Sequence, residues 1–182
     1  LVVGPNAFRR QLGGYSAGQT PIVDTPVNVM ALDGIRKEAG DDMEVLFEKG
    51  WTTDEERGAK GIEDILPGFD PEMLMDISPE MMAGFMGEKP PKRHVPEDPD
   101  LNADDDMLIA RAVEAAKKVD MVVVVAGTDA SNASEEHDRD TLDLPYGQDE
   151  KIQKIIEANP NTVVVITALG AVTGAFVEKS HT

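Results

Sequence analysis

Two adjacent glutamates, Glu135 and Glu136, are the side chains in this sequence best suited to proton transfer. A carboxyl group held partly protonated can act as a general acid and afterwards as a general base, and a second carboxylate beside it favours the protonated form. The adjacent His137 can donate a hydrogen bond or, when charged, lower the pKa of a glutamate. In so acidic a chain, a solvated loop is the alternative interpretation of both glutamates, and the residues alone favour it.

The elements around these glutamates predict where they lie. Met121 to Val125 is an apolar run without alternation, which is typical of a parallel strand buried on both faces, and Gly127, Thr128 and Asp129 end it. The polar segment therefore leaves the carboxyl end of a strand, the edge at which open α/β sheets bind ligands. Farther along, Leu142, Leu144 and Pro145 are expected to anchor the segment on the sheet and to start the next helix.

Strands and helices alternate along most of the sequence. This order requires a mainly parallel sheet with right-handed crossovers, so we predict an α/β fold, a three-layer α/β/α sandwich truncated at both ends. The expected helices are 25–40, with Thr25 as N-cap, Pro26 at its start and Val29, Leu32 and Ile35 on its apolar side; 103–116, with Met107, Ile109, Ala112, Val113 and Ala116; and 148–158, with Ile152, Ile155 and Ile156. The expected strands are 1–4, 43–47, 121–125 and 162–166.

Residues 51–102 do not follow the alternation. They are rich in Pro, Gly, Asp and Glu, with five methionines between Met73 and Met86. We predict one domain spanning residues 1–182, with this acidic, Met- and Pro-rich segment as an insertion. Packing is the favoured role for its methionines, while closure over a site, a subunit contact and hence oligomerisation stay open.

Composition excludes several classes of partner. A formal net charge of −18 repels nucleic acid and anionic membranes. There is no cysteine, no signal peptide pattern and no apolar run of membrane-spanning length, and the compartment stays open. The sequence begins inside an apparent strand and stops without a closing element, so we expect a piece of a longer protein.

Other polar and aromatic residues have plainer interpretations. His94 and His181 are expected to be exposed, and three scattered histidines predict no metal site. Asp104 to Asp106 lack the spacing of a calcium loop and suit a helix start. Trp51 and Tyr15 are expected to pack rather than to stack on sugars. No glycine pattern of a nucleotide loop is present, so we expect no cofactor.

Several segments, taken in order, resemble one family. They are VVGPNA, LGGYS, ALDGIRKEAG, VVVVAGTD, SEEHDR, LDLPYGQDEKI and NPNTVVVITALGAV. Together they are similar to the C-terminal α/β sandwich domain of glycoside hydrolase family 3, which includes β-glucosidases and β-xylosidases. The run from GTD through DR and LxLPxxQ to NPNTVVV is the most specific part of the resemblance.

The resemblance implies an active site shared by two domains of a retaining β-glycosidase. An N-terminal (β/α)8 barrel, absent from this sequence, supplies the aspartate nucleophile, and this domain supplies the acid/base from a loop. In the family's EGxDR pattern the glutamate has that role, which falls on Glu135. The usual glycine is Glu136 here, so Glu136 is the second choice. The implied substrate is a β-linked oligosaccharide or an aryl or alkyl glycoside, and the fragment alone is expected to be inactive.

His137 and Arg139 are the implied substrate-binding residues. For Arg139, a salt bridge with Asp138 that fixes the loop is favoured over sugar contact, because arginine suits bidentate carboxylate pairing. Glu135 and Glu136 do not fit the two carboxyl groups about 5 to 5.5 Å apart that retaining hydrolysis needs, since adjacent side chains in an extended loop tend to point apart. One glutamate working with an aspartate from the barrel fits better.

Two other kinds of function stay open. One is a non-catalytic module that covers the barrel or binds carbohydrate, with the Glu135 loop as a lid. The other is a receiver-like signalling domain that binds Mg²⁺ through Asp129. The absence of a second acidic cluster after the first strand counts against the receiver-like domain.

Overall fold

The fold is described by a computed structural model. The described residues are 1–8, 29–54, 100, 103–129, 131–132 and 139–179. Within them, no helix is long and apolar enough to cross a membrane.

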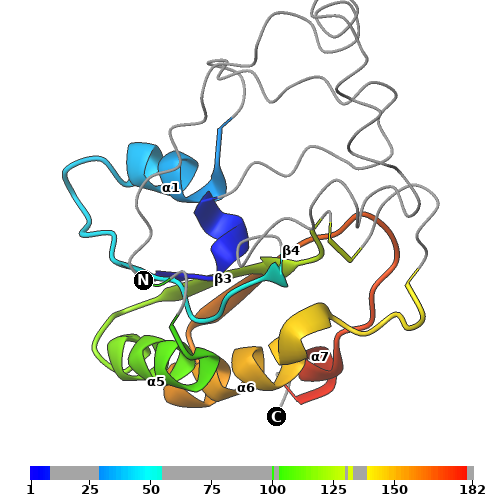
Figure 1. Cartoon of the computed structure of the whole chain (residues 1–182). Coiled ribbons are helices and arrows are strands. Elements are labelled where there is room, and N and C mark those ends of the chain that lie inside the picture. Colours follow the sequence, from blue (N-terminus) through cyan, green and yellow to red (C-terminus); the bar gives the residue numbers. More distant parts are fainter. Residues whose placement is uncertain (9–28, 55–99, 101–102, 130, 133–138, 180–182) are drawn as a thin grey trace, which may run out of the picture.

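A four-stranded parallel sheet forms the centre of the molecule (Figure 1). Its strands are β1 (Val2–Val3), β2 (Phe47–Glu48), β3 (Val122–Gly127) and β4 (Thr162–Thr167), in the spatial order β2-β1-β3-β4. All three neighbouring pairs are parallel. The chain runs outward from β1 to β2 on one side and from β3 to β4 on the other. The gap between β1 and β3 is therefore a topological switch point, where open α/β sheets place ligands.

Helices cover both faces of this sheet. The 3-10 helix η1 (Pro5–Phe8) and α1 (Ala31–Ala39) lie on one face. On the other face lie α5 (Asp105–Ala116), α6 (Gln148–Ala158), which the 3-10 helix η3 (Pro145–Gly147) precedes, and the short α7 (Ala175–Lys179). The predicted three-layer α/β/α sandwich is confirmed.

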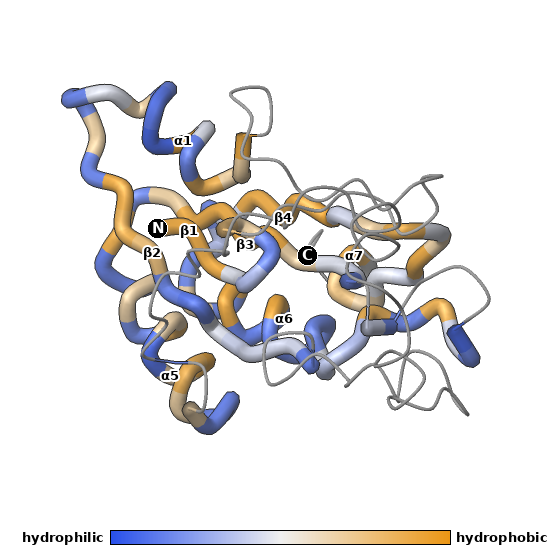
Figure 2. Tube along the Cα trace, turned by 45° about the horizontal axis from the view of Figure 1, so that its top comes forward, coloured by the Kyte–Doolittle hydropathy of each residue, from blue (hydrophilic) through white to orange (hydrophobic). Residues whose placement is uncertain are grey.

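Two apolar clusters meet at β3. Val122, Val124 and Ala126 join the larger cluster with α5 and α6, and Val125 joins the smaller one with α1. Burial on both faces explains the unbroken apolar run, which appears as the apolar middle of the sheet in Figure 2. The larger cluster comprises Val3, Trp51, Ile109, Ala112, Ala116, Val122, Val124, Ala126, Leu144, Ile152, Ile155 and Phe176.

Strand β4 has an equally apolar sequence but buries only one face. Val164 and Ile166 pack on the larger cluster. Val163 and Val165 point to the α1 side of the sheet and are 48% and 40% exposed. An apolar run in the sequence thus does not by itself show that both faces of a strand are covered.

The first helix begins later than predicted. Met30 has extended backbone (φ −72°, ψ 150°), so α1 starts at Ala31. Val29, expected on the apolar side, lies outside the helix and is exposed. Gly40 ends α1 as predicted, with φ +57° and its N–H donating to the Arg36 carbonyl. Thr25 and Pro26 lie outside the described residues.

The range of β2 and the buried side of α5 also differ from the prediction. β2 is Phe47–Glu48 instead of 43–47, because Phe47 and Glu48 are the residues that pair with β1. α5 buries Leu108 with Ala112 and Ala116, four residues apart, and leaves Met107 exposed.

The start of α5 has the predicted acidic cap. Asp104 is the N-cap, and its side chain accepts a hydrogen bond of 2.7 Å from the Asp106 N–H. Trp51, predicted to pack, is fully buried in the larger cluster. Trp51, Thr52 and Thr53 are thus part of the core, while residues 55–99 of the predicted insertion lie outside the described part of the chain.

Candidate active site

The carboxyl end of β3 is fixed by a glycine and a glutamine. Gly127 has φ +144°, and a Cβ there would lie 1.7 Å from the Thr167 carbonyl oxygen. The Gly127 N–H donates to Gln148 Oε1 and the Gln148 Nε2 donates to the Gly127 carbonyl, both at 2.7 Å. Gln148 is fully buried at the start of α6, so it joins this helix directly to the strand end.

Three strand ends are tied together beside Gly127. The Asn6 side chain, which follows β1, donates to Thr167 Oγ1 at 2.9 Å and to the Thr128 carbonyl at 3.4 Å. Thr128 Oγ1 accepts a hydrogen bond of 2.8 Å from the Leu169 N–H. The ends of β1, β3 and β4 thus form one buried polar layer from which the acidic segment leaves.

Asp129 shapes the first residues of that segment. It is fully buried, and its Oδ1 accepts hydrogen bonds from the Ser131 N–H at 2.8 Å, from the Ser131 hydroxyl and from Asn132 Nδ2 at 3.1 Å. Its Oδ2 accepts from the Tyr146 hydroxyl at 2.9 Å. An aspartate bonded to the backbone two residues on is an Asx-turn. Because neighbouring donors already engage both oxygens, a Mg²⁺ site of the receiver type is disfavoured.

Tyr146 closes this network from η3. Its hydroxyl also lies 2.8 Å from Ser131 Oγ and accepts a hydrogen bond of 2.9 Å from Asn132 Nδ2. Burial, together with the nearby Asp129 carboxylate, raises the pKa of Tyr146 to about 12. Its backbone is left-handed (φ 60°, ψ 21°), which costs a residue with a side chain ~1–2 kcal/mol. The surrounding contacts must offset that cost.

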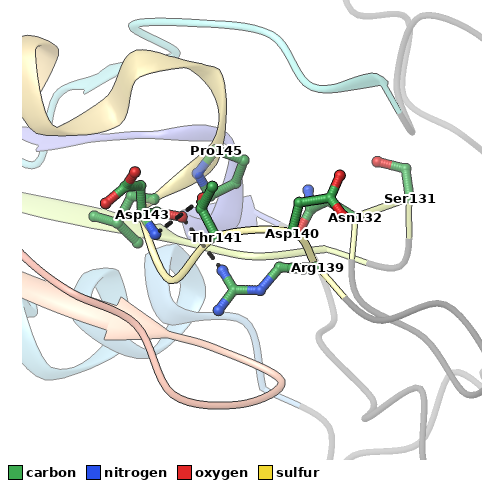
Figure 3. Close-up of a pocket in the computed structure, with 8 residues that line it drawn as sticks. Ser131, Asn132, Arg139, Asp140, Thr141, Asp143 and Pro145 are labelled. Atoms are coloured by element: carbon green, nitrogen blue, oxygen red, sulfur yellow. Dashed lines mark hydrogen bonds between the residues drawn. The ribbon is translucent and has the colours of Figure 1, made fainter.

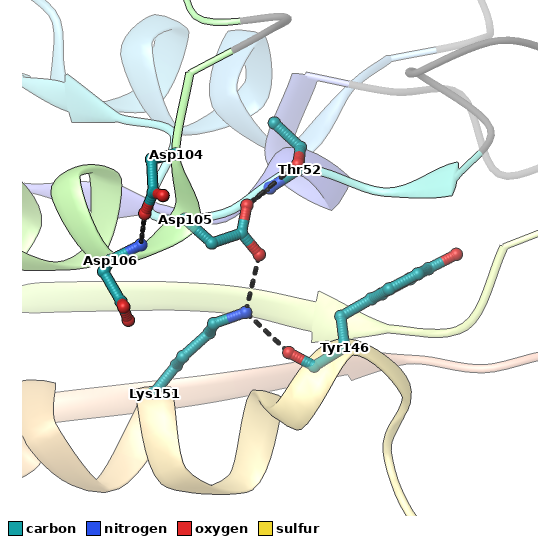
Figure 4. Close-up of polar contacts among 6 residues, drawn as sticks. All are labelled: Thr52, Asp104, Asp105, Asp106, Tyr146 and Lys151. Atoms are coloured by element: carbon teal, nitrogen blue, oxygen red, sulfur yellow. Dashed lines mark hydrogen bonds and ion pairs between the residues drawn. The ribbon is translucent and has the colours of Figure 1, made fainter.

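Lys151 and Asp105 form a second polar network, which contacts the backbone of Tyr146 (Figure 4). Lys151 Nζ donates to the Tyr146 carbonyl at 2.6 Å and to Asp105 Oδ2 at 2.8 Å. Asp105 Oδ1 accepts from the N–H and the hydroxyl of Thr52. Burial acts to raise the pKa of Asp105, but Lys151 and Thr52 outweigh it and hold that pKa below its usual value.

The segment after the glutamates is held differently. Arg139 donates through Nη1 to the Asp143 carbonyl at 3.4 Å and through Nη2 to the Ala171 carbonyl. The Thr173 N–H donates to the Leu142 carbonyl at 2.7 Å. These contacts attach residues 139–143 to the chain that follows β4. Leu144 is buried and Pro145 begins η3, both as predicted, but Leu142 is 55% exposed, so Leu144 and not Leu142 anchors the segment in the core.

An open cavity of about 350 Å³ lies between these two attachments (Figure 3). It is lined by Ser131, Asn132, Arg139, Asp140, Thr141, Asp143, Leu144 and Pro145. Its walls thus come from both the segment that precedes the glutamates and the segment that follows them. Among the described residues, no group of acidic or histidine side chains has the arrangement of a metal site.

The structure describes only some of the predicted site residues. Glu135, Glu136, His137 and Asp138 lie outside the described residues. Arg139 lies at the cavity, with its guanidinium on two backbone carbonyls. The sequence interpretation missed Tyr146 and Gln148 as parts of the site. The signals for Asp129, Ser131 and Asn132 were the GTD motif, which contains Asp129, and their turn-forming spacing after a strand.

Comparison with known proteins identifies the family. A model of the glycosyl hydrolase family 3 C-terminal domain matches residues 1–181. The chain belongs to this family. The family resemblance seen in the sequence is thereby confirmed.

Family 3 relatives match parts of the chain. "Probable beta-glucosidase I" of Aspergillus terreus is 52% identical over 59 residues, which is 32% of this chain and 7% of that protein. "Probable beta-glucosidase I" of Aspergillus clavatus is 45% identical over 73 residues, which is 40% of this chain and 9% of that protein. The matched part of the chain is thus about a tenth of the length of these curated relatives.

A solved structure matches nearly the whole family 3 domain. A β-glucosidase of Erythrobacter marinus is 27% identical to this chain with a TM-score of 0.62. The match covers 98% of this chain and 20% of that one. This similarity supports the α/β sandwich.

Proposed function

We propose that this domain is the accessory catalytic domain of a retaining β-glycosidase of the β-glucosidase type. It supplies the general acid/base, Glu135, from the loop between Asn132 and Arg139. The aspartate nucleophile is on an N-terminal barrel of the same protein. The observation that carries the proposal is the family 3 match over residues 1–181, and similarity to proteins named β-glucosidases points to the same class of substrate.

The geometry of the described residues supports this role. The loop leaves the carboxyl end of β3 next to the switch point between β1 and β3, where an α/β sheet exposes loops to a ligand. Hydrogen bonds attach both of its ends to the domain, through Asp129 on one side and Arg139 on the other. A loop with two fixed ends can present one carboxyl group to a partner domain in a reproducible position.

The chemistry follows the two-carboxylate scheme. Glu135 donates a proton to the glycosidic oxygen while the barrel aspartate attacks the anomeric carbon; the bond from that carbon to the glycosidic oxygen breaks, the aglycone leaves as an alcohol or phenol, and a covalent glycosyl-enzyme remains. Glu135, now a carboxylate, takes a proton from a water molecule, and the resulting hydroxide displaces the aspartate. The substrate class is a β-linked glucoside, either an oligosaccharide or an aryl or alkyl glycoside.

The neighbours of Glu135 have different roles in this proposal. His137 is a substrate-binding residue. Arg139 acts chiefly on the loop, because its guanidinium already donates to the carbonyls of Asp143 and Ala171. Glu136 is the second choice for the acid/base. The unit that carries these residues is one domain, residues 1–182, with its insertion in the range 51–102.

The test is hydrolysis of aryl β-glucosides by the full-length protein, as wild type, Glu135→Gln and Glu136→Gln. Loss of the acid should lower kcat/KM by about 10²- to 10⁴-fold for leaving groups of high pKa and much less for those of low pKa. Azide should partly restore turnover of the good leaving groups by attacking the glycosyl-enzyme without base assistance. If Glu136→Gln shows this pattern and Glu135→Gln does not, the role moves to Glu136; if neither does, the domain is a non-catalytic module.

A further inference from the structure

Tyr146 contacts the described residues that come just before the glutamate loop in the sequence. Its hydroxyl is within hydrogen-bonding distance of Asp129, Ser131 and Asn132, which immediately precede the loop. Tyr146 itself follows the loop in the sequence, in η3. It therefore connects the chain before the glutamates to the helix that comes after them.

The backbone of Tyr146 is an independent sign of a specialised position. In the described part of the chain it is the one non-glycine residue with positive φ. Backbone strain of this kind persists only where surrounding contacts impose it, and such positions concentrate at functional sites. Gly147 also has positive φ, which glycine adopts without strain. At Tyr146 the strained backbone carries a side chain whose hydroxyl donates to Asp129 at the end of β3.

The contacts behind Tyr146 make it a rigid support. Lys151 holds its carbonyl, and the same ammonium pairs with Asp105 at the start of α5. Lys151 and Asp105 are both partly buried. Side chains from two helices therefore fix the backbone of Tyr146. Because the Tyr146 hydroxyl hydrogen-bonds to Ser131 and Asn132, this fixed backbone also restrains the positions of those two side chains.

We propose that Tyr146 is a positioning residue for the acid/base loop, which holds Ser131 and Asn132 so that the following glutamate meets the glycosidic oxygen. This inference rests on the proposed function and adds a residue to it. Tyr146 acts through its neighbours and does not touch the substrate. A hydroxyl with a pKa of about 12 stays a neutral donor at any pH near neutrality. The Tyr146 hydroxyl therefore keeps its proton over the pH range in which the loop glutamate changes charge.

The test compares three variants of the full-length enzyme on aryl β-glucosides with a range of leaving groups. Tyr146→Phe removes the hydroxyl and keeps the ring. Ile155→Val is the structural control, since it removes a buried methylene from α6 and leaves the side-chain hydrogen bonds of Tyr146 in place. Glu135→Gln is the reference for complete loss of the acid. Thermal unfolding of each variant shows how much stability is lost.

For Tyr146→Phe we expect kcat/KM to fall roughly ten- to a hundredfold with poor leaving groups, because a misplaced acid transfers its proton inefficiently. With the best leaving groups, the loss should be smaller than about threefold, since they need little protonation. The basic limb of the pH profile should also move. Ile155→Val should lower activity with all leaving groups alike, if at all.

Two outcomes separate this inference from the proposed function. If Glu135→Gln and Glu136→Gln both lack leaving-group dependence, the proposed function fails, and the inference fails with it. If Glu135→Gln shows the dependence but Tyr146→Phe matches Ile155→Val at every leaving group, the positioning role alone is refuted. If Tyr146→Phe does not fold, Ser131→Ala and Asn132→Ala are measured instead. The inference then requires that these two variants show the same leaving-group dependence.

Discussion

The two ends of the glutamate loop are held by different kinds of contact. The end that follows β3 is buried and depends on side-chain chemistry: Asp129, Ser131 and Tyr146 bond to one another through carboxylate and hydroxyl groups. The end that precedes η3 is largely exposed and depends on backbone carbonyls that Arg139 reaches. Removing a hydrogen-bond partner destabilises the fold more when the polar group left behind is buried than when it is exposed to water. The first end should therefore tolerate substitution much less than the second.

The largest expected effect is at the strand end itself. Gly127→Ala places a Cβ 1.7 Å from the Thr167 carbonyl at a backbone angle that favours glycine, so the pairing of β3 and β4 must break. We expect the free energy of opening of the β3 amides, measured by hydrogen exchange in the full-length protein, to fall by more than ~4 kcal/mol. Gly170→Ala is the control, because it has open space around it and should change little.

Gln148→Ala should have the next largest effect. It leaves the buried N–H and carbonyl of Gly127 without their 2.7 Å partners. The same β3 amides should lose roughly 2–4 kcal/mol of protection. Gln153→Ala, on the same helix and with an exposed hydrogen bond to Glu157, should cost less than ~1 kcal/mol. Equal losses in the two variants would contradict the idea that Gln148 links α6 to the strand end.

Arg139→Ala tests the exposed end of the loop. It removes two hydrogen bonds to carbonyls, and we expect the amides near residues 171–173 to lose about 0.5–1.5 kcal/mol of protection. Arg36→Ala on the exposed side of α1 should change stability by less than ~0.5 kcal/mol. A loss as large as that of Gln148→Ala would remove the difference between the two ends.

The smallest effect is a pH dependence at Asp105. Its folded-state pKa is depressed, so it contributes stability above its unfolded pKa, about 3.9, and that contribution is lost as pH falls through the lower folded value. Unfolding at graded pH should show a decrease in stability below about pH 4 that is weaker in Asp105→Asn. Glu114→Gln is the control: Lys117 also lowers the pKa of this carboxylate, but the pair is exposed, so solvent screening should leave little effect on stability. An unchanged acid limb in Asp105→Asn would mean that Lys151 and Thr52 do not stabilise the carboxylate.

The sequence predicted the parts of the fold that have strong local signals. β3 and α6 were expected within two residues of their observed ends, because a doubly buried strand and an amphipathic helix each carry a clear apolar pattern. β2 was misplaced because its position depends on pairing with β1, which no local pattern reveals. Met107 was wrongly placed on the buried side of α5. The buried residue is its neighbour Leu108, which lies four residues before the buried Ala112.

The candidate site was predictable only as a segment. The family pattern identified the loop that carries Glu135, and the strand before it fixed the edge of the sheet. The role of Tyr146 could not be read in advance, since it depends on a left-handed turn that returns the phenol to residues 15 and 17 positions earlier. Sequence separation hides such a contact even when the motif that contains it, LPYGQ, is noticed.

The sequence separation of β3 from its two neighbours has a consequence for how the chain folds. β4 follows β3 after a single helix, whereas Val2 of β1 pairs with Val123 of β3 from the far end of the chain. Contacts that close long stretches of chain form slowly. The β3–α6–β4 unit should therefore form the folding nucleus, with the amino-terminal strand joining late and leaving first during unfolding.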